Sequence, residues 1–292
     1  MTGMAGVDYS RAGSAASDSG PPLRDKILTN YGLGACKALG LRGYLRYLAT
    51  TLFALPAILR QRSLRPVDVA MHGLVSLRHP VTGLPVRIDL DVYRPSDEEE
   101  GTFTFGLVRE IWMRNVYLKP FRWPPRLDCV IDLGANRGVF ALQACHFAEQ
   151  VIAVEVMGKY AAPLQRNLAL NHLANLTLVK AFIGGEGFMA PGDGAVIGLH
   201  QAMAMAGERA IDFMKIDIEG SEFGLDLSPL ARVKRLAMEV HPRWGDPASL
   251  ISEVTALGFE CRLFDDAMRR VGVENAAFIY AINTRFPEAT WT

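Results

Sequence analysis

The stretch Leu-Asp-Cys-Val-Ile-Asp-Leu-Gly-Ala-Asn-Arg-Gly-Val-Phe, residues 127–140, decides the fold of this 292-residue chain. Its first half is a short apolar run, which is typical of a strand buried on both faces of a parallel sheet. Gly134 breaks the run, and Gly138 opens a segment, residues 139–149, with helical spacing of apolar residues. A strand, a glycine turn and a helix in this order open a nucleotide-binding βαβ unit, because glycines let a ligand approach the backbone and the helix start offers free N–H groups.

The glycine spacing narrows the choice of nucleotide. The dinucleotide fingerprint requires G-x-G-x-x-G. Gly134 matches its first glycine, but Asn136 and Val139 occupy the second and third positions. The missing glycines therefore weaken the hypothesis of an NAD-dependent oxidoreductase without excluding it. A glycine pair alone would also suit an ordinary strand-to-helix turn.

The pattern that is left, D-x-G-A-N-x-G, resembles the first motif of class I methyltransferases, which use S-adenosylmethionine. The resemblance implies that the glycine turn packs against the amino-acid end of this cofactor. It also implies that an acid at the end of the second strand binds the ribose hydroxyls, and Glu155 ends a predicted strand at residues 151–154. We therefore expect S-adenosylmethionine as the cofactor, held at this end by Asp132, Gly134, Ala135, Asn136, Gly138 and Glu155.

Charge and cysteine content bear on the binding partner and on the cellular compartment. The formal net charge is zero, which gives no electrostatic support for a nucleic-acid partner. The four cysteines are scattered, without a C-x-x-C pair and without a signal peptide, so we expect buried thiols in a reducing compartment, not disulfides or zinc ligands, and a cytoplasmic protein. They are Cys36, Cys129, Cys145 and Cys261.

The chain divides into three predicted parts. Residues 1–22 are rich in Ser, Gly and Ala and are predicted to be a disordered tail. Residues 23–101 are predicted to form a helical and β-hairpin extension, with the hairpin at roughly 69–77 and 85–92. Residues 102–292 are predicted to form the methyltransferase domain.

The segment 27–65 has two open interpretations. Seven basic residues and no acid lie between Lys26 and Arg65, and residues 48–59 form an uncharged, mostly apolar run. This run is shorter than the roughly 20 residues that cross a bilayer. The favoured interpretation is a pair of helices packed on the catalytic domain; the alternative is a basic amphipathic segment in peripheral contact with an anionic membrane.

Further along, the acidic run 97–100 is interpreted as a solvated loop without a role, and residues 102–118 as a helix whose Trp112 and Tyr117 belong to the core. From residue 127 strands and helices alternate, which predicts an α/β fold with a doubly wound, mostly parallel seven-stranded sheet, Rossmann-like as in class I methyltransferases. The predicted elements are strands at 176–181, 211–217 and 235–240, helices at 160–172 and 246–257, an irregular loop at 183–207, and a closing antiparallel pair at 259–264 and 276–282.

A second stretch, Asp-Phe-Met-Lys-Ile-Asp-Ile-Glu-Gly-Ser-Glu at residues 212–222, resembles the FkbM family of methyltransferases, together with Met-Glu-Val-His-Pro at 238–242. The resemblance spans about residues 103–282. It implies transfer of a methyl group to a hydroxyl of a sugar, glycolipid or polyketide-like small molecule. Asn167 and Asn171 also match family positions, or are two surface polar residues. Val156, where the family has proline, and Arg137, where it has an apolar residue, depart from the pattern.

Parallel strands bring their carboxyl ends to one rim, so the residues after each strand should converge there. We expect Asp217, Glu219 and His241 to be catalytic, and Asp217 also to bind the cofactor where it meets the substrate. His241, largely neutral at pH 7, is placed to act as the base, with the two acids orienting it or the acceptor; the alternative is a structural histidine at the strand end. Asp212 and Glu222 are interpreted as surface or capping groups.

The sequence leaves four points undecided. Asp217, Glu219, Glu239 and His241 are suitable ligands for one divalent cation, but we favour no metal, with these groups bonding cofactor and substrate. Ala181 and Phe182 are expected beside the adenine, Phe182 as a stacking face or as plain core. A non-catalytic cofactor-binding or membrane-docked protein is the alternative function, and the oligomeric state, a homodimer included, is undetermined.

Overall fold

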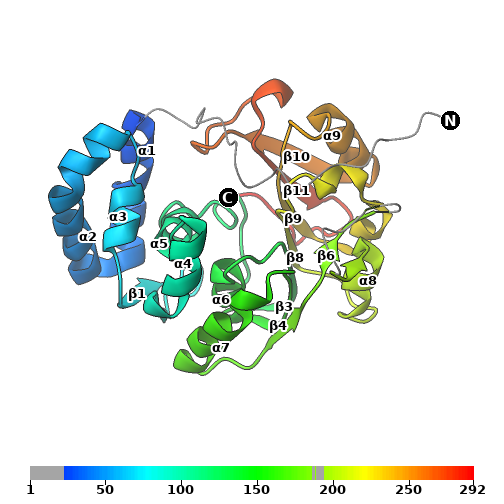
Figure 1. The fold of residues 1–292 in the computed structure, drawn as a ribbon. Coiled ribbons are helices and arrows are strands. Elements are labelled where there is room, and N and C mark those ends of the chain that lie inside the picture. The colour runs from blue at the N-terminus through cyan, green and yellow to red at the C-terminus, as the bar shows by residue number, and fades with distance from the viewer. Residues whose placement is uncertain (1–22, 186–187, 189–193) are drawn as a thin grey trace.

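The computed structural model of the chain describes residues 23–185, 188 and 194–292. The predicted tail, residues 1–22, lies outside them. A seven-stranded sheet lies at the centre of the protein, as the sequence predicts (Figure 1). From edge to edge the strands are β10 (Phe259–Phe264), β11 (Phe278–Asn283), β9 (Arg235–Glu239), β8 (Phe213–Ile216), β3 (Leu127–Leu133), β4 (Ala148–Val154) and β5 (Leu176–Val179).

The sheet is mostly parallel. Strands β9, β8, β3, β4 and β5 run in one direction, while β11 is antiparallel to both of its neighbours, β9 and β10. The predicted closing antiparallel pair is therefore confirmed. Because five parallel strands end at one edge, the residues that follow them share that edge.

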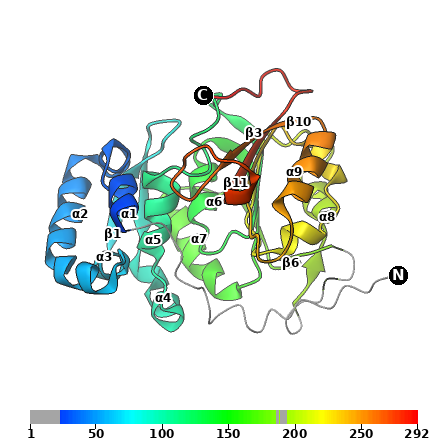
Figure 2. The same cartoon turned by 90° about the horizontal axis from the view of Figure 1, so that it is seen from above.

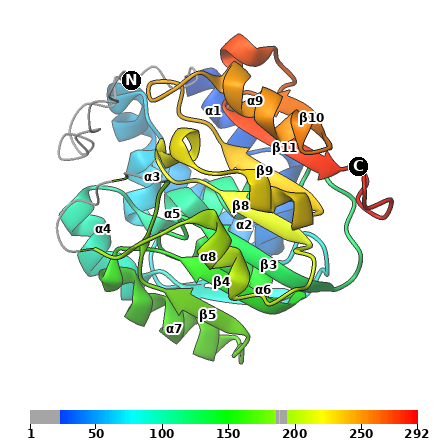
Figure 3. The same cartoon turned by 90° about the vertical axis from the view of Figure 1, so that its right-hand side faces the viewer.

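Helices cover both faces of the sheet (Figure 2). On one face lie α6 (Val139–Cys145) and α7 (Ala161–Leu170); on the other lie α8 (Leu199–Ala204) and α9 (Pro247–Ala256), which stand in front of the sheet in Figure 3. Side chains of β3 point alternately to the two faces of the sheet. Val130 belongs to the hydrophobic core that includes residues of α6 and α7, whereas Cys129, Ile131 and Leu133 belong to the core that includes residues of α8 and α9.

The N-terminal segment packs beside the α6 and α7 face. It comprises α1 (Leu23–Asn30), α2 (Leu33–Gln61), α3 (Arg65–Ala70), β1 (Leu74–Arg78), β2 (Pro85–Asp89), η2 (Asp91–Tyr93), α4 (Arg94–Glu100), α5 (Thr104–Val108) and the π-helix η3 (Arg109–Met113). Buried Tyr47 and Ile58 of α2 belong to the same core as Phe105 and Phe140. Residues 27–65 thus form helices packed on the rest of the chain.

The hairpin is shorter than predicted, because Val69 and Ala70 belong to α3. It is fixed to α7 by two asparagines: Oδ1 of Asn167 accepts the N–H of Asp89 at 2.7 Å, and Asn171 bonds both backbone groups of Arg87. Asn167 is fully buried, so its interpretation as a surface residue is wrong. Each amide side chain replaces a strand partner that the edge of β2 lacks.

Several predicted boundaries are wrong. The helix after the glycine turn ends at Cys145, not at residue 149, because Ala148 already pairs with Leu127 in the sheet. The predicted helix 102–118 ends at Met113. The predicted irregular segment 183–207 contains β7 (Val196–Ile197), which pairs with β6 (Phe182–Ile183), and α8; residues 186–187 and 189–193 of it lie outside the described part.

No helix in the described part of the chain combines the length and the apolar character needed to cross a bilayer.

Candidate active site

One cavity of about 650 Å³ lies at the carboxyl edge of the parallel strands, where β3, β4 and β8 end. Gly134, Glu155 and Asp217, one residue beyond each of these strands, all line it, as do Asn136, Ala181, Phe182 and Glu219. The other lining residues are Val154, Val156, Met157, Tyr160, Ile183, Phe188, Gly194, Ile218 and Ser221. The structure therefore brings these residues together as expected from the strand order, whereas five other predicted site residues do not line this cavity: Asp132, Ala135, Gly138, Glu239 and His241.

The glycine turn brings two strand ends into close contact. Gly134 has a φ of +75°, and a Cβ on it would lie 1.7 Å from the carbonyl oxygen of Asp217. Gly138 has a φ of +72°, and its Cβ would meet the side chain of Leu164 at 2.6 Å. Both positions therefore require glycine for steric reasons as well as for backbone conformation.

Glu155 is held by the turn that it faces. Its Oε2 accepts the N–H of Asn136 and its Oε1 accepts the N–H of Met157, each at 2.7 Å. Burial raises the pKa of Glu155, and these two hydrogen bonds work in the opposite direction. Each oxygen keeps a second lone pair for a hydroxyl donor, as a ribose would supply.

The wall of the cavity between β4 and β6 is apolar. Val156, Met157, Ala181 and Phe182 contribute to it. Phe182 is only partly buried, and its ring lies 6.1 Å from that of Phe188. Such a wall suits a flat aromatic base between apolar side chains.

Asp132 does not line the cavity. It is fully buried, with an oxygen 3.0 Å from Nζ of Lys215. That ammonium also donates to the carbonyl oxygen of Gly134 at 2.9 Å and lies 3.5 Å from Oδ2 of Asp217. Asp132 therefore acts on the cavity through Lys215, which positions both the glycine turn and Asp217.

Sequence reasoning missed Lys215 as a site residue. The signal was present, since Lys215 is the one charged residue within the fully buried strand β8. Burial disfavours its charged form, but the carboxylates of Asp132 and Asp217 outweigh burial and raise the pKa of Lys215. A buried lysine that stays charged marks a place where negative charge is gathered.

Tyr117, interpreted as plain core, also takes part in the site. Its ring is buried, but its hydroxyl lies 3.2 Å from Oδ2 of Asp217 and 3.4 Å from Oε2 of Glu239. Burial, with the nearby charges of Asp217 and Glu110, raises the pKa of Glu239 well above its usual range. A carboxyl group that keeps its proton is a poor metal ligand and a hydrogen-bond donor to its neighbours.

His241 is held by Glu222, not by the acids that the sequence suggested. Nδ1 of His241 lies 2.9 Å from Oε1 of Glu222, which also accepts the backbone N–H of His241 at 3.0 Å. Oε2 of Glu222 accepts the N–H of Gly220 at 2.8 Å. Glu222 is fully buried, so its interpretation as a surface group is wrong, whereas the expected capping role is present, because Glu222 lies in the first turn of η5 (Ser221–Gly224) and accepts the N–H of Gly220 before it. Asp212, by contrast, caps the start of β3 by accepting the N–H groups of Asp128 and Cys129.

The charge around His241 changes its expected state. Burial opposes protonation, but the hydrogen bond to Glu222 and the charges of Glu222, Glu219 and Asp217 outweigh it, and the pKa of His241 is raised. The raised pKa favours the protonated imidazole more than the sequence-based expectation of a largely neutral ring assumed. The same carboxylate would stabilise the imidazolium that results when the ring accepts a proton.

A cation site can be assembled from part of the expected set. Ligand atoms of Asp217, Glu219 and His241 lie within 4.8 Å of one another. Glu239 is not in this group. The ammonium of Lys215 already lies beside Asp217, so the site carries an internal cation. The preference for a metal-free site stays a prediction.

A second, polar cavity of about 450 Å³ is lined by residues of α1, α3 and η3. Glu110 lines it, and the charge of Asp217 contributes, after burial, to raising the pKa of Glu110. Hydroxyl, amide and charged side chains dominate its lining: Asp25, Thr29, Asn30, Ser63, Arg65, Asp68, Arg109, Glu110, Arg114 and Asp266. The cavity thus offers many hydrogen-bond partners, and Glu110 links it electrostatically to Asp217.

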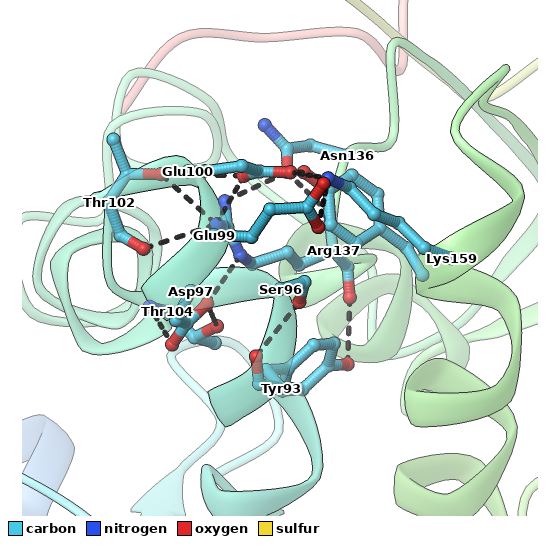
Figure 4. Close-up of polar contacts among 11 residues, drawn as sticks. Tyr93, Ser96, Asp97, Glu99, Glu100, Thr102, Thr104, Asn136, Arg137 and Lys159 are labelled. Atoms are coloured by element: carbon cyan, nitrogen blue, oxygen red, sulfur yellow. Dashed lines mark hydrogen bonds and ion pairs between the residues drawn. The ribbon is translucent and has the colours of Figure 1, made fainter.

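The acidic run 97–100 is not a solvated loop, and the assignment of no role to it is wrong. It ends helix α4, and Arg137 of the glycine turn donates to Asp97 at 2.8 Å and to Glu100 at 2.6 Å (Figure 4). The hydroxyl of Tyr93 donates to the carbonyl oxygen of Arg137, and Lys159 pairs with Glu100. The unexpected arginine therefore ties the turn to the N-terminal segment.

No family model and no curated protein matches the chain. Among solved structures it is similar to an rRNA methylase from Streptococcus thermophilus, with 14% identity over 60% of this chain and 95% of that chain and a TM-score of 0.39. It is also similar to methyltransferase FkbM from Methylobacillus flagellatus KT, with 16% identity, 60% and 52% coverage and a TM-score of 0.41. A precorrin-6y C5,15-methyltransferase from Geobacter metallireducens GS-15 matches with 15% identity, 54% and 79% coverage and a TM-score of 0.34.

Proposed function

We propose that this chain is an S-adenosylmethionine-dependent methyltransferase that acts on a hydroxyl of a sugar, glycolipid or polyketide-like acceptor. One observation carries the proposal. Gly134, Glu155 and Asp217, which follow three different strands, line a single cavity of about 650 Å³. That volume is in the range of cofactor pockets.

The donor side of the site fits a sulfonium nucleoside. Glu155 has free lone pairs for ribose hydroxyls, and the apolar wall with Phe182 suits adenine. Asp217 and Glu219 supply negative charge for a cationic centre. When bound, the cofactor supplies an already activated methyl group, so the protein has to align the acceptor and manage its proton.

The acceptor side can be derived from the network around Asp217. Alignment of donor and acceptor is worth up to ~7–11 kcal/mol, and a positioned base roughly 10²–10⁴-fold. Asp217, fixed by Lys215 and Tyr117, is placed to orient the acceptor hydroxyl. His241, held by Glu222, is placed to receive its proton. The polar cavity beside Glu110 suits an acceptor with several hydroxyls.

The FkbM-type resemblance gains physical support from two members of its K-I-D-x-E-G-x-E string. Lys215 pairs with both Asp132 and Asp217, while Glu222 fixes His241. The string thus links the donor turn to the proposed base through side chains, which a generic nucleotide-binding turn does not require.

The test is incubation of the full chain with isotopically labelled S-adenosylmethionine and a small-molecule and lipid extract, followed by mass spectrometry. We expect a labelled product, and its loss in Asp217→Asn with cofactor affinity changed less than about tenfold. Asp128→Asn is the matched control, because Asp128 is an exposed acid at the other end of β3. Cofactor binding without any labelled product would favour the non-catalytic alternative; binding of NAD in its place would overturn the proposal.

A further inference from the structure

Helix α2 lies at the outer edge of the molecule (Figure 1). It carries large apolar side chains that the described part of the protein does not cover. Phe53 is 89% exposed, Leu52 71% and Leu41 70%. Leu45, Leu55 and Leu59 are exposed in the same way. Isolated exposed leucines are common, but six large exposed apolar side chains between residues 41 and 59 mark an interaction surface.

Four of these side chains form a stripe on one face of the helix, and Phe53 lies at the border of that stripe, on the side of Arg42 and Arg60. Leu41, Leu45, Leu52 and Leu59 are spaced by four and seven residues, which places them above one another. Tyr47 and Ile58 lie on the opposite face and are buried against the domain. Helix α2 therefore has one apolar face for the core and a second that faces outward.

The charged residues of α2 indicate which kind of partner its outer face would bind. No acid lies between residues 27 and 65. Arg42 and Arg60 are exposed and each follows a leucine of the stripe by one position. An apolar stripe with cations at its border is the pattern of a helix that lies in the plane of an anionic bilayer.

Other occupants fit less well. A second copy paired through the same face would bring like charges together, since an isologous contact repeats one patch and this segment has no acid to neutralise them. The stripe from Leu41 to Leu59 is about 27 Å long, at 1.5 Å per residue. Its face is continuous along that length, which favours a flat surface over a small pocket.

We propose that α2 docks the protein on the surface of an anionic lipid bilayer. The stripe of Leu41, Leu45, Leu52 and Leu59, with Phe53 at its border, enters the boundary between headgroups and acyl chains, while Arg42 and Arg60 contact lipid phosphates. The proposal is independent of the donor chemistry, because it uses none of the residues of the candidate active site.

The test is flotation of the full chain with phosphatidylcholine vesicles that contain or lack phosphatidylglycerol. We expect binding to the anionic vesicles that weakens with salt. The double variant Leu52→Asp/Phe53→Asp should bind at least about tenfold more weakly, because two large side chains leave the interface. Arg42→Gln/Arg60→Gln should lose roughly fivefold per arginine, the factor that corresponds to about 1 kcal/mol per cation.

Met205→Asp is the matched control, since Met205 is an exposed apolar residue after α8, on the opposite side of the sheet from α2 (Figure 1). It should bind vesicles like the unaltered protein. Unchanged melting curves would establish that all the variants fold. Failure of the unaltered protein to bind anionic vesicles would overturn the proposal, as would a dimer that Leu52→Asp/Phe53→Asp converts to monomer.

Discussion

The buried carboxylate of Glu222 fixes His241 at two points, Nδ1 at 2.9 Å and the backbone N–H at 3.0 Å. The first contact orients the ring, and the second joins the turn after β8 to the end of β9. Nε2 is left facing the exposed acid Glu219 at 3.6 Å. An imidazole oriented at one nitrogen by a buried acid has its other nitrogen available for proton transfer.

Glu222→Gln should therefore change the pH dependence of methyl transfer. The negative charge of Glu222 helps to raise the pKa of His241, so its loss should lower that pKa. If His241 acts as the base, the acidic limb of kcat/KM against pH moves to lower pH, and the maximal rate falls by about tenfold or more. Glu219→Gln, at an exposed and more distant acid, should give a smaller shift in the same direction. An unchanged pH profile in Glu222→Gln would exclude His241 as the base.

Gly134→Ala should destabilise the protein far more than a comparable change elsewhere. The added Cβ would lie 1.7 Å from the carbonyl oxygen of Asp217, so β3 and β8 must separate. Gly207→Ala is the control: its φ is +69° and nothing lies within 4 Å of the new Cβ, so it should cost only about 1–2 kcal/mol. Urea unfolding measures both. Similar losses in the two variants would contradict the steric role assigned to Gly134.

The sequence predicted those parts of the fold that depend on local pattern. The apolar run of β3, the glycine turn and the alternation of strands and helices led to the sheet and to the edge where Gly134, Glu155 and Asp217 meet. The side chains that complete the site depend on contacts between distant positions. Arg137 and Asp97 are 40 residues apart and form a buried ion pair, so the acidic run resembled an ordinary solvated loop.

The same reason explains the roles of Glu222 and Tyr117. Glu222 turns inward because the left-handed backbone at Glu219 and Gly220 reverses the chain just before it, which no periodicity indicates. Tyr117 has a buried ring and a hydroxyl at the site. The sequence pattern indicates only that the ring is buried. Buried polar partners are found from geometry, since each must be paired with another group.

Arg137→Gln tests the tie between the glycine turn and the N-terminal segment. Both Arg137 and Asp97 are nearly inaccessible, so the variant leaves a buried carboxylate without its cation and should lose about 3–5 kcal/mol of unfolding free energy. Arg126→Gln is the control, because the Arg126–Glu149 pair is exposed and should be worth less than about 1 kcal/mol. Chemical denaturation at neutral pH compares them. A loss within 1 kcal/mol of zero for Arg137→Gln would mean that the network contributes little to stability.

His79 should make the protein less stable in acid. Burial, reinforced by the neighbouring His146, lowers the pKa of His79 to about 3 from its ordinary value of 6.5. The contacts explain why the ring stays neutral: Nδ1 accepts the N–H groups of Val81 and Thr82, and Nε2 donates to the carbonyl oxygen of Gln143 at 3.1 Å. Protonation of Nδ1 would break both hydrogen bonds of the hairpin turn.

The sign of the effect follows from the protons bound in each state. Between pH 6.5 and 3 the unfolded chain binds a proton at this residue that the native protein does not, so stability is lost as the pH falls. At pH 5 the loss is about 2 kcal/mol, from 1.36 kcal/mol per pH unit. Urea unfolding at pH 8, 6.5 and 5 measures it. His79→Gln should be less stable at pH 8 but lose this part of the acid dependence, whereas His200→Gln, at an exposed histidine on α8, should retain it. An equal slope in His79→Gln and the unaltered protein would show that another group causes the loss.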